Sequence, residues 1–305
     1  MQTLNANGQT TIGGSEISAV IGINRWKTPL ALWAEKTGAL EVKDISEVDA
    51  VKLGTELEDF VAQKFSKETG LSVRRTPKTY YHKENARLRA NVDRIITGTD
   101  ELLECKTASA YKVKEWRDDV PVEYILQVVW YLGITGRKKG YIAVLVGGQK
   151  FIWKEILADE KLFQDLVRQA ENFLKLVDDK IQPAINFGDR DTLAELYPDS
   201  APEIECPIET LEEAQQIETD LTYRAELMKY KTETDHQIEL IENKIKDKMK
   251  LASLLTVGEY RATWKTQKTK RLDNDAIKKA GLYEKYTTEI STRIFRVTKT
   301  TKKEQ

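Results

Sequence analysis

The sequence predicts a mixed α/β domain that ends near residue 195, followed by a helical and β-hairpin appendage. Three observations predict this fold class. Apolar residues recur at helical spacing between residues 46 and 70, whereas residues 71–108 form short β-rich runs separated by turn residues. From residue 121 onward a helix, two strands and a second helix follow. This order is typical of helices packed on a mixed sheet.

The composition indicates a soluble folded protein. The chain has 305 residues, of which 40% are hydrophobic and 32% charged, and no run approaches the roughly 18 apolar residues of a membrane span. With two cysteines and two histidines, a zinc site of the usual Cys/His kind is not expected, and a four-cysteine cluster is out of reach. The first residues lack the basic start and apolar run of a secretory signal, so we expect a cytoplasmic protein.

Three helices are expected before the first strand. Their bounds are 16–23, 29–36 and 46–70. Ser15 stands where the first needs an N-cap, and Pro29 begins the second, which Gly38 closes. In the third helix Gly54 and Glu58 are one turn apart and share a face.

The centre of the domain alternates strands and helices. Strands are expected at 71–82, 87–97 and 101–108, a helix at 121–135, strands at 140–148 and 150–157, and a helix from 159 to about 180. Gly98-Thr99-Asp100 is predicted to be the hairpin turn between the second and third strands.

The C-terminal third is expected to form an appendage. Residues 185–207 have the composition of a connector, and we place the boundaries at 1–195, 196–207 and 208–305. A long charged helix is expected from 208 to about 249, and it pairs with a partner helix or packs on its own domain. Strands are expected at 256–271 and 291–301, where apolar and basic residues alternate.

The appendage is also basic, with 13 Lys/Arg against 5 Asp/Glu from Arg261 to Gln305. Its aromatic residues Tyr260, Trp264 and Phe295 suit a DNA surface, a core, or a module for oligomerisation or partner docking. The sequence leaves these interpretations open.

The residues that carry chemistry lie around the hairpin turn. Residues two apart in a strand share a face, so Glu104 and Lys106 emerge side by side, and the hairpin brings Asp93 opposite them. Asp93 and Glu104 interrupt otherwise apolar strands, where burying charge is costly unless something binds it. Two carboxylates suit Mg²⁺, with Mn²⁺ as a substitute, and the lysine suits the attacking water of phosphodiester hydrolysis.

Five segments resemble a known family, the YqaJ-type viral recombinases. They are GGSEISAVIGINRWKTPLALWAEKTG, GTELEDFVAQKFSKETG, ANVDRII, LLECKTAS and EYILQVVWYLGITG, and they occur in the family's order within the first 180 residues or so. The family resembles lambda exonuclease, a member of the PD-(D/E)xK nuclease superfamily. The resemblance therefore implies a restriction-endonuclease-like core with a mixed central sheet flanked by helices.

The resemblance also implies roles for matching residues. Asp93 and Glu104 would be the principal metal ligands, joined by the main-chain carbonyl of Cys105 and by Glu58. Lys106 would position the nucleophilic water. Gln127 would complete the motif.

Phosphate contacts are expected from three further residues. Ser15 matches the family's serine near the terminal phosphate, and Arg25 lies in the loop that follows its helix. Asn91 stands two residues before Asp93, where lambda exonuclease is expected to have serine, and this departure puts the phosphate contact there in question.

Ordinary structural roles compete with these assignments. Ser15 suits a simple helix cap, Arg25 a solvated loop, and Glu58 the surface of an amphipathic helix. Gln127 suits a satisfied polar residue beside the core, and Cys105 is expected to be a small buried side chain rather than a nucleophile.

Three functions are consistent with the sequence. The first is a processive exonuclease that degrades the 5′-ended strand of linear duplex DNA and passes the 3′ tail to a single-strand annealing protein. The second is an endonuclease with the same site. The third is a DNA-binding scaffold without catalysis, against which the joint presence of Asp93, Glu104 and Lys106 argues. By resemblance the protein is expected to be a trimer.

Overall fold

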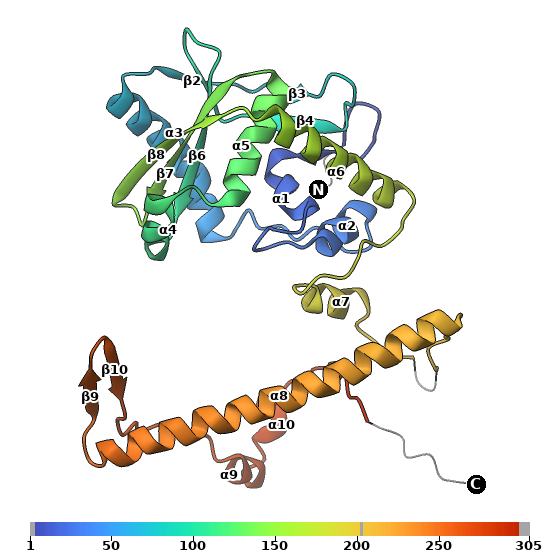
Figure 1. Ribbon diagram of the computed structural model, residues 1–305, viewed down its shortest axis with the longest axis vertical. Coiled ribbons are helices and arrows are strands. Elements are labelled where there is room, and N and C mark those ends of the chain that lie inside the picture. The colour runs from blue at the N-terminus through green and yellow to red at the C-terminus, as the bar shows by residue number, and fades with distance from the viewer. Residues whose placement is uncertain (1–3, 202–203, 299–305) are drawn as a thin grey trace. The chain divides into compact units, whose positions relative to one another are not determined.

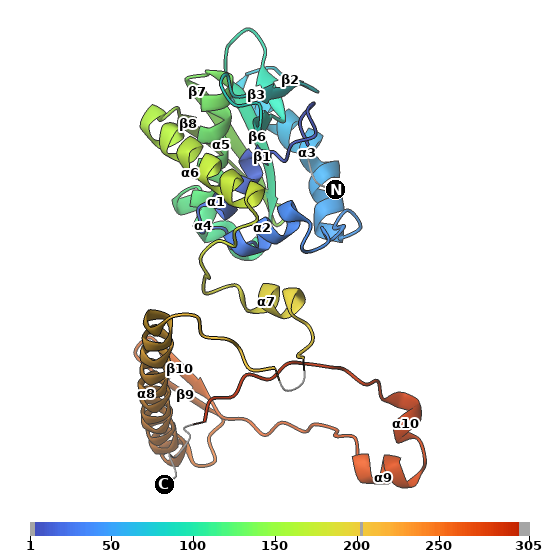
Figure 2. The ribbon, with the colours of Figure 1, turned by 90° about the vertical axis from the view of Figure 1, so that its right-hand side faces the viewer.

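The computed structural model describes residues 4–201 and 204–298. The chain divides into two compact units, Met1–Pro198 and Asp199–Gln305. In Figures 1 and 2 the ribbon runs from blue to yellow through the first unit and from yellow to red through the second. Among the described residues no helix is both long and apolar enough to cross a membrane.

The first unit is built on a five-stranded mixed sheet in the order β2-β5-β6-β7-β8. The strands are β2 (Val73–Arg75), β5 (Arg94–Ile96), β6 (Leu102–Ala108), β7 (Lys139–Val146) and β8 (Lys150–Leu157). Only the β6–β7 pair is parallel, and the other three are antiparallel. The expected mixed central sheet is therefore confirmed, and β6 lies at its centre between β5 and β7.

A smaller three-stranded sheet stands beside the large one. Its order is β1 (Ile12–Gly13), β4 (Leu88–Asn91) and β3 (Thr79–Tyr81). Strand β1 pairs parallel with β4, which pairs antiparallel with β3. Since β4 leads into β5 through only Val92 and Asp93, the two sheets meet at Asp93.

Helices cover both faces of the large sheet, as Figure 2 shows for α3 and α5. On one face α3 (Asp49–Thr69) packs Val61 and Phe65 against Leu103 and Cys105 of β6. On the other face α5 (Val122–Thr135) covers Leu102 of β6 within the main core. The two-residue period of a strand separates these faces, so Glu104 and Lys106 belong to the α5 side.

Further helices complete the first unit. They are η1 (Gly14–Glu16), α1 (Ile17–Val20), α2 (Pro29–Thr37), η2 (Ala110–Lys112), α4 (Val113–Asp118), α6 (Glu160–Asp178) and α7 (Arg190–Leu196). Helix α2 begins with Pro29 and ends at Gly38, which adopts a left-handed conformation, as predicted. The Thr28 side chain caps α2 by accepting a hydrogen bond from Ala31 N at 3.1 Å.

Two expectations for the first unit are wrong. Ser15 is not an N-cap, because it lies inside η1, whose N-cap is Gly13. The Glu16 carboxylate accepts a hydrogen bond from Gly13 N at 2.9 Å and satisfies that donor. The stretch expected to be a plain connector also contains α7, because Leu193 and Leu196 pack against the main core.

The described residues of the second unit form a long helix, a hairpin and two short helices. Helix α8 (Leu211–Met249) is followed by β9 (Leu254–Val257), β10 (Tyr260–Thr263), α9 (Asn274–Lys279) and α10 (Tyr283–Tyr286). Both views show the hairpin at the C-terminal end of α8. Most large apolar side chains of α8 are exposed, and Met249 is its buried residue.

The hairpin differs from the one the sequence predicts. The sequence predicts strands at 256–271 and 291–301, but the antiparallel pair is confined to residues 254–263. Gly258, at a φ of 55°, and Glu259 form a two-residue turn that closes a local hairpin. Residues 291–298 form no strand, and residues 299–301 lie outside the described part.

Candidate active site

The β5–β6 hairpin places Asp93 beside Glu104. Arg94 is opposite Leu103 in the register, so the next pair along the two strands joins Asp93 and Glu104. At this position a side chain takes the place of a backbone acceptor: Cys105 N donates a hydrogen bond to Asp93 Oδ2 at 2.8 Å. The expectation that this turn brings Asp93 opposite Glu104 is met by the backbone.

Glu104 is the centre of a buried polar cluster. Its side chain is almost completely buried, and its Oε1 accepts hydrogen bonds from Lys106 Nζ at 2.6 Å and from Gln127 Nε2 at 2.7 Å. The second proton on Gln127 Nε2 is donated to the Tyr131 hydroxyl at 2.8 Å. Within the described residues Glu104 Oε2 has no hydrogen-bond donor. One carboxylate oxygen thus has two donors and the other has none in the described chain, while the Asp93 carboxyl group lies within hydrogen-bond reach of the Glu104 side chain.

Burial and neighbouring charge control the ionisation of the cluster. Burial raises the pKa of Glu104 to about 8, with a smaller upward contribution from Asp93 and a downward one from Lys106. Burial likewise raises the pKa of Asp93. Burial opposes the charge on Lys106, but Glu104 and Asp93 outweigh it and raise its pKa. Burial therefore disfavours the ionised form of both carboxyl groups, whereas the Lys106 ammonium group favours it.

Lys106 has an aromatic neighbour as well. Its Nζ lies 5.4 Å from the ring centroid of Tyr124, which is on α5. An ammonium over a ring face is attracted by the negative face of the ring. Helix α5 thus supplies a neighbour to each strand residue: Tyr124 contacts Lys106, and Gln127 contacts Glu104.

Within the described residues Glu58 makes no hydrogen bond to this cluster, although its charge contributes to the raised pKa of Asp93. It projects from α3, on the opposite face of the sheet, and its Oε1 accepts hydrogen bonds from the buried Arg94 and from Arg75, the latter at 3.3 Å. Arg94 also binds Asp59. Arg94 is opposite Leu103, whose side chain is on the α3 side, so alternation along β5 accounts for the separation.

Cys105 is buried among apolar side chains on the α3 side. Burial, and secondarily the charge of Asp93, raises the pKa of its thiol well above the usual range. A thiol that stays protonated is a poor nucleophile, so the side chain is structural. Its backbone N–H has a separate role, because it holds Asp93 in place.

The three residues expected to contact phosphate occupy different surroundings. Ser15 is exposed and follows Gly14, which packs so closely on Tyr131 that an added Cβ would lie 2.4 Å from the ring. Arg25 is engaged in ion pairs with Glu115 and Glu123, the latter at 3.1 Å. Asn91 is exposed at the end of β4.

Sequence reasoning missed Tyr131, Tyr124 and Arg94. Tyr131 follows Gln127 by four residues on one helix, and that spacing could have identified it as a neighbour of the amide. Arg94 follows Asp93 directly, but nothing in the sequence distinguishes a buried arginine from a solvated one.

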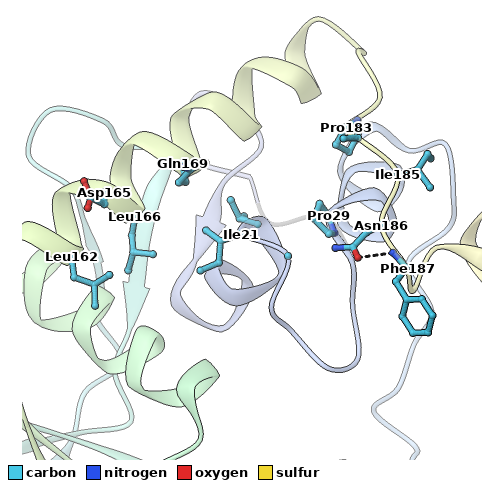
Figure 3. Close-up of a pocket in the computed structure, with 13 residues that line it drawn as sticks. Ile21, Pro29, Leu162, Asp165, Leu166, Gln169, Pro183, Ile185, Asn186 and Phe187 are labelled. Carbon is cyan, nitrogen blue, oxygen red and sulfur yellow. Dashed lines mark hydrogen bonds between the residues drawn. The ribbon is translucent and has the colours of Figure 1, made fainter. Parts of the chain in front are cut away.

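A separate pocket of about 650 Å³ lies between α1, α6 and the segment 183–187. Figure 3 shows Ile21, Leu162 and Leu166 along it, with the Asn186 side chain bound to the backbone of Phe187. None of the candidate catalytic residues lines it. It belongs to the outer helices rather than to the carboxylate cluster.

The carboxylate cluster has the donors that a hard metal ion prefers, although it is small. Within the described residues no group of three or more His, Cys, Asp and Glu side chains is arranged as a metal site. Asp93 and Glu104 nevertheless supply two adjoining carboxylates, and Glu104 Oε2 is buried without a donor. Such an oxygen is costly unless a cation or a proton binds it. The donor set fits a hard, oxygen-preferring ion.

Comparison with known proteins shows which family this chain resembles. Residues 6–138 match the model of the YqaJ-like viral recombinase domain. A Bacillus subtilis (strain 168) protein, YqaJ, is 38% identical over 299 residues, which cover 93% of this chain and 90% of that protein.

Two solved structures are also similar. The alkaline exonuclease LHK-Exo from Laribacter hongkongensis aligns over 56% of this chain and 89% of its own, at 21% identity and a TM-score of 0.48. A phage related exonuclease from Haemophilus somnus 129PT aligns over 57% of this chain and 96% of its own, at 13% identity and a TM-score of 0.42. Because the identity to the Bacillus protein extends over nearly the whole of both chains, this chain belongs to the YqaJ-like viral recombinase family.

Proposed function

We propose that this protein is a Mg²⁺-dependent DNA exonuclease with a PD-(D/E)xK core. It would hydrolyse phosphodiester bonds in the 5′-ended strand of linear duplex DNA and leave 3′ single-stranded tails. The observation that carries the proposal is the buried cluster of Asp93, Glu104, Lys106 and Gln127, in which Glu104 Oε2 has no donor among the described residues. The family's description as viral recombinases supports DNA as the substrate.

The residues of the cluster would have different roles in hydrolysis. Asp93 and Glu104 would hold the ion, together with the main-chain carbonyl of Cys105, and Mg²⁺ or Mn²⁺ would supply charge stabilisation at the phosphate. Gln127 fixes Glu104 by donating to Oε1, and Tyr131 fixes Gln127. These contacts keep the carboxylate in one orientation before substrate arrives.

Lys106 would orient the attacking water. Its ammonium is anchored by Glu104 at 2.6 Å and by the ring of Tyr124. The water oxygen bonds to phosphorus and releases its proton to solvent, one phosphorus–oxygen bond of the chain breaks, and the departing oxygen takes up a proton from solvent. An ammonium with a raised pKa stays charged at neutral pH, so it donates hydrogen bonds to water instead of removing its proton.

The experiment is digestion of linear duplex DNA labelled at either the 5′ or the 3′ end, with closed circular DNA as a second substrate. Wild type is compared with Lys106→Ala and with Lys150→Ala, an exposed lysine of the same sheet. We expect loss of the 5′-ended strand of linear DNA only. Lys106→Ala should bind DNA but lower turnover by about 100-fold or more, whereas Lys150→Ala should match wild type.

Several outcomes would contradict the proposal. Near-normal turnover by Lys106→Ala would remove its role, and cleavage of the circle would favour an endonuclease. DNA binding without digestion in Mg²⁺ or Mn²⁺ would favour a scaffold. Ca²⁺ should permit binding without turnover, because its larger shell misplaces the reacting groups.

The proposal extends to assembly and partner. A trimer is inferred from the family resemblance, and light scattering of the purified protein would measure its mass. A single-strand annealing protein is the partner expected to receive the 3′ tail. Co-purification of such a protein with wild type tests this expectation.

A further inference from the structure

The segment from Tyr260 to Arg271 carries an unusual concentration of positive charge. The whole chain has 48 Lys/Arg and 49 Asp/Glu, yet these twelve residues contain five Lys/Arg and no Asp/Glu. The five are Arg261, Lys265, Lys268, Lys270 and Arg271, and all are exposed. None forms an ion pair with an acidic residue of the described chain. The segment is therefore an unneutralised cationic surface, flanked by Glu259 and Asp273.

Two large aromatic side chains lie within the same segment. Tyr260 is 72% exposed and Trp264 is 48% exposed. Trp264 N donates to Ser253 O at 3.1 Å, so the hairpin pairing continues one residue beyond β10. Tyr260 and Trp264 therefore lie on one face of the strand, about 13 Å apart at the usual strand rise. A two-stranded hairpin has no second layer with which to bury them.

We propose that residues 260–271 form a binding surface for single-stranded DNA. Tyr260 and Trp264 stack on bases, and the five cations contact the phosphates. Charge alone would suit duplex and single strand equally. The exposed rings select the single strand, because stacking on a side chain needs a base that is not already stacked within a helix.

This inference goes beyond hydrolysis and rests on the proposed function for its biological sense, since a 3′ tail is the strand that digestion would release. The surface belongs to the second unit and uses none of the residues placed in the candidate active site. Binding and hydrolysis can therefore be measured separately on the same preparation.

The experiment measures binding by the full-length protein in EDTA. The probes are a dye-labelled oligothymidine and a duplex of equal length, titrated by fluorescence anisotropy at several salt concentrations. One variant is Lys265→Ala/Lys268→Ala/Lys270→Ala. Its matched control removes three exposed lysines of α8: Lys229→Ala/Lys231→Ala/Lys244→Ala.

The aromatic pair is tested in parallel. Tyr260→Ala/Trp264→Ala is compared with Tyr223→Ala/Tyr230→Ala, which removes two exposed rings from α8. All four side-chain sets are on the surface, so circular dichroism should show that every variant keeps its helix content. Digestion of linear duplex in Mg²⁺ is measured on the same samples.

The expected results separate the two contributions. The triple lysine variant should reduce the slope of log affinity against log salt by about 2, because each phosphate that a lysine neutralises adds about 0.7 to that slope. The aromatic variant loses two stacked bases and should bind oligothymidine about 30-fold more weakly, with duplex binding unchanged. Both α8 controls should bind as wild type does.

Two results would overturn the inference. One is that the triple lysine variant and the aromatic variant both bind oligothymidine like their controls. The other is that these variants keep DNA affinity but lose self-association, which would make residues 260–271 a protein-docking face. Absence of digestion, with binding that still depends on residues 260–271, would instead refute the proposed function and leave this binding surface standing.

Discussion

Replacing Glu104 by glutamine isolates the cost of the buried carboxylate. The substitution keeps the shape, and the glutamine oxygen can still accept from Lys106 and Gln127. Its amide nitrogen takes the place of Oε2, the oxygen without a donor, in a side chain that has the Asp93 carboxyl group as a neighbour. The change removes a charge that folding buries and adds a donor where one is lacking.

The magnitude follows from the pKa. The folded protein raises the pKa of Glu104 from 4.5 to about 8, so the folded state binds more protons than the unfolded state between these values. Stability from this group is fully present below about pH 4.5 and is lost as pH rises towards 8. Between about pH 5 and about pH 9 the loss amounts to about 4 kcal/mol in the metal-free protein.

Urea unfolding in EDTA, followed by tryptophan fluorescence across this pH range, measures the effect. The free energy of unfolding of wild type minus that of Glu104→Gln should fall as pH rises, because other titrating groups are common to both proteins. At about pH 9 the variant should be the more stable. Mg²⁺ should stabilise wild type and leave the variant unchanged. A difference that does not vary with pH would refute the assignment of the raised pKa to Glu104.

Two further substitutions test the packing around the cluster. Gly14→Ala places a Cβ 2.4 Å from the ring of Tyr131, so we expect about 2 kcal/mol of destabilisation and a lower melting temperature in calorimetry; an unchanged melting temperature would show that the ring yields freely. Arg94→Leu leaves Glu58 without its buried partner, and we expect a loss of about 3 kcal/mol in urea unfolding, against no change for Arg168→Leu on the surface.

Much of the first unit follows from local sequence patterns. The alternation of β6 and the turn at 98–100 are sufficient to place Asp93, Glu104 and Lys106 together, because a strand has a fixed two-residue period. Gln127 lies on α5, and this apolar helix must cover the same face of the sheet. These residues could be predicted because period and turn length constrain them directly.

Other features depend on tertiary contacts that no local pattern contains. Glu58 shares a helix face with Gly54 as predicted, but its carboxylate is bound by Arg94, and that partner is fixed by the β2–β5–β6 packing. The C-terminal strands were misplaced because alternation of apolar and basic residues continues far beyond the hairpin. Strand β10 ends at Thr263, because the two-residue turn at Gly258 and Glu259 pairs only the short strands on either side of it.

The length of the turn between β5 and β6 also fixes the register of the two strands. Five residues, 97–101, separate the strands, and their number decides which face of the sheet receives Asp93. An insertion of one residue that slipped the register would move this carboxylate to the α3 side, among Leu103, Cys105 and Phe65. A one-residue slip of register at this turn would therefore leave the fold without its paired acids, Asp93 and Glu104.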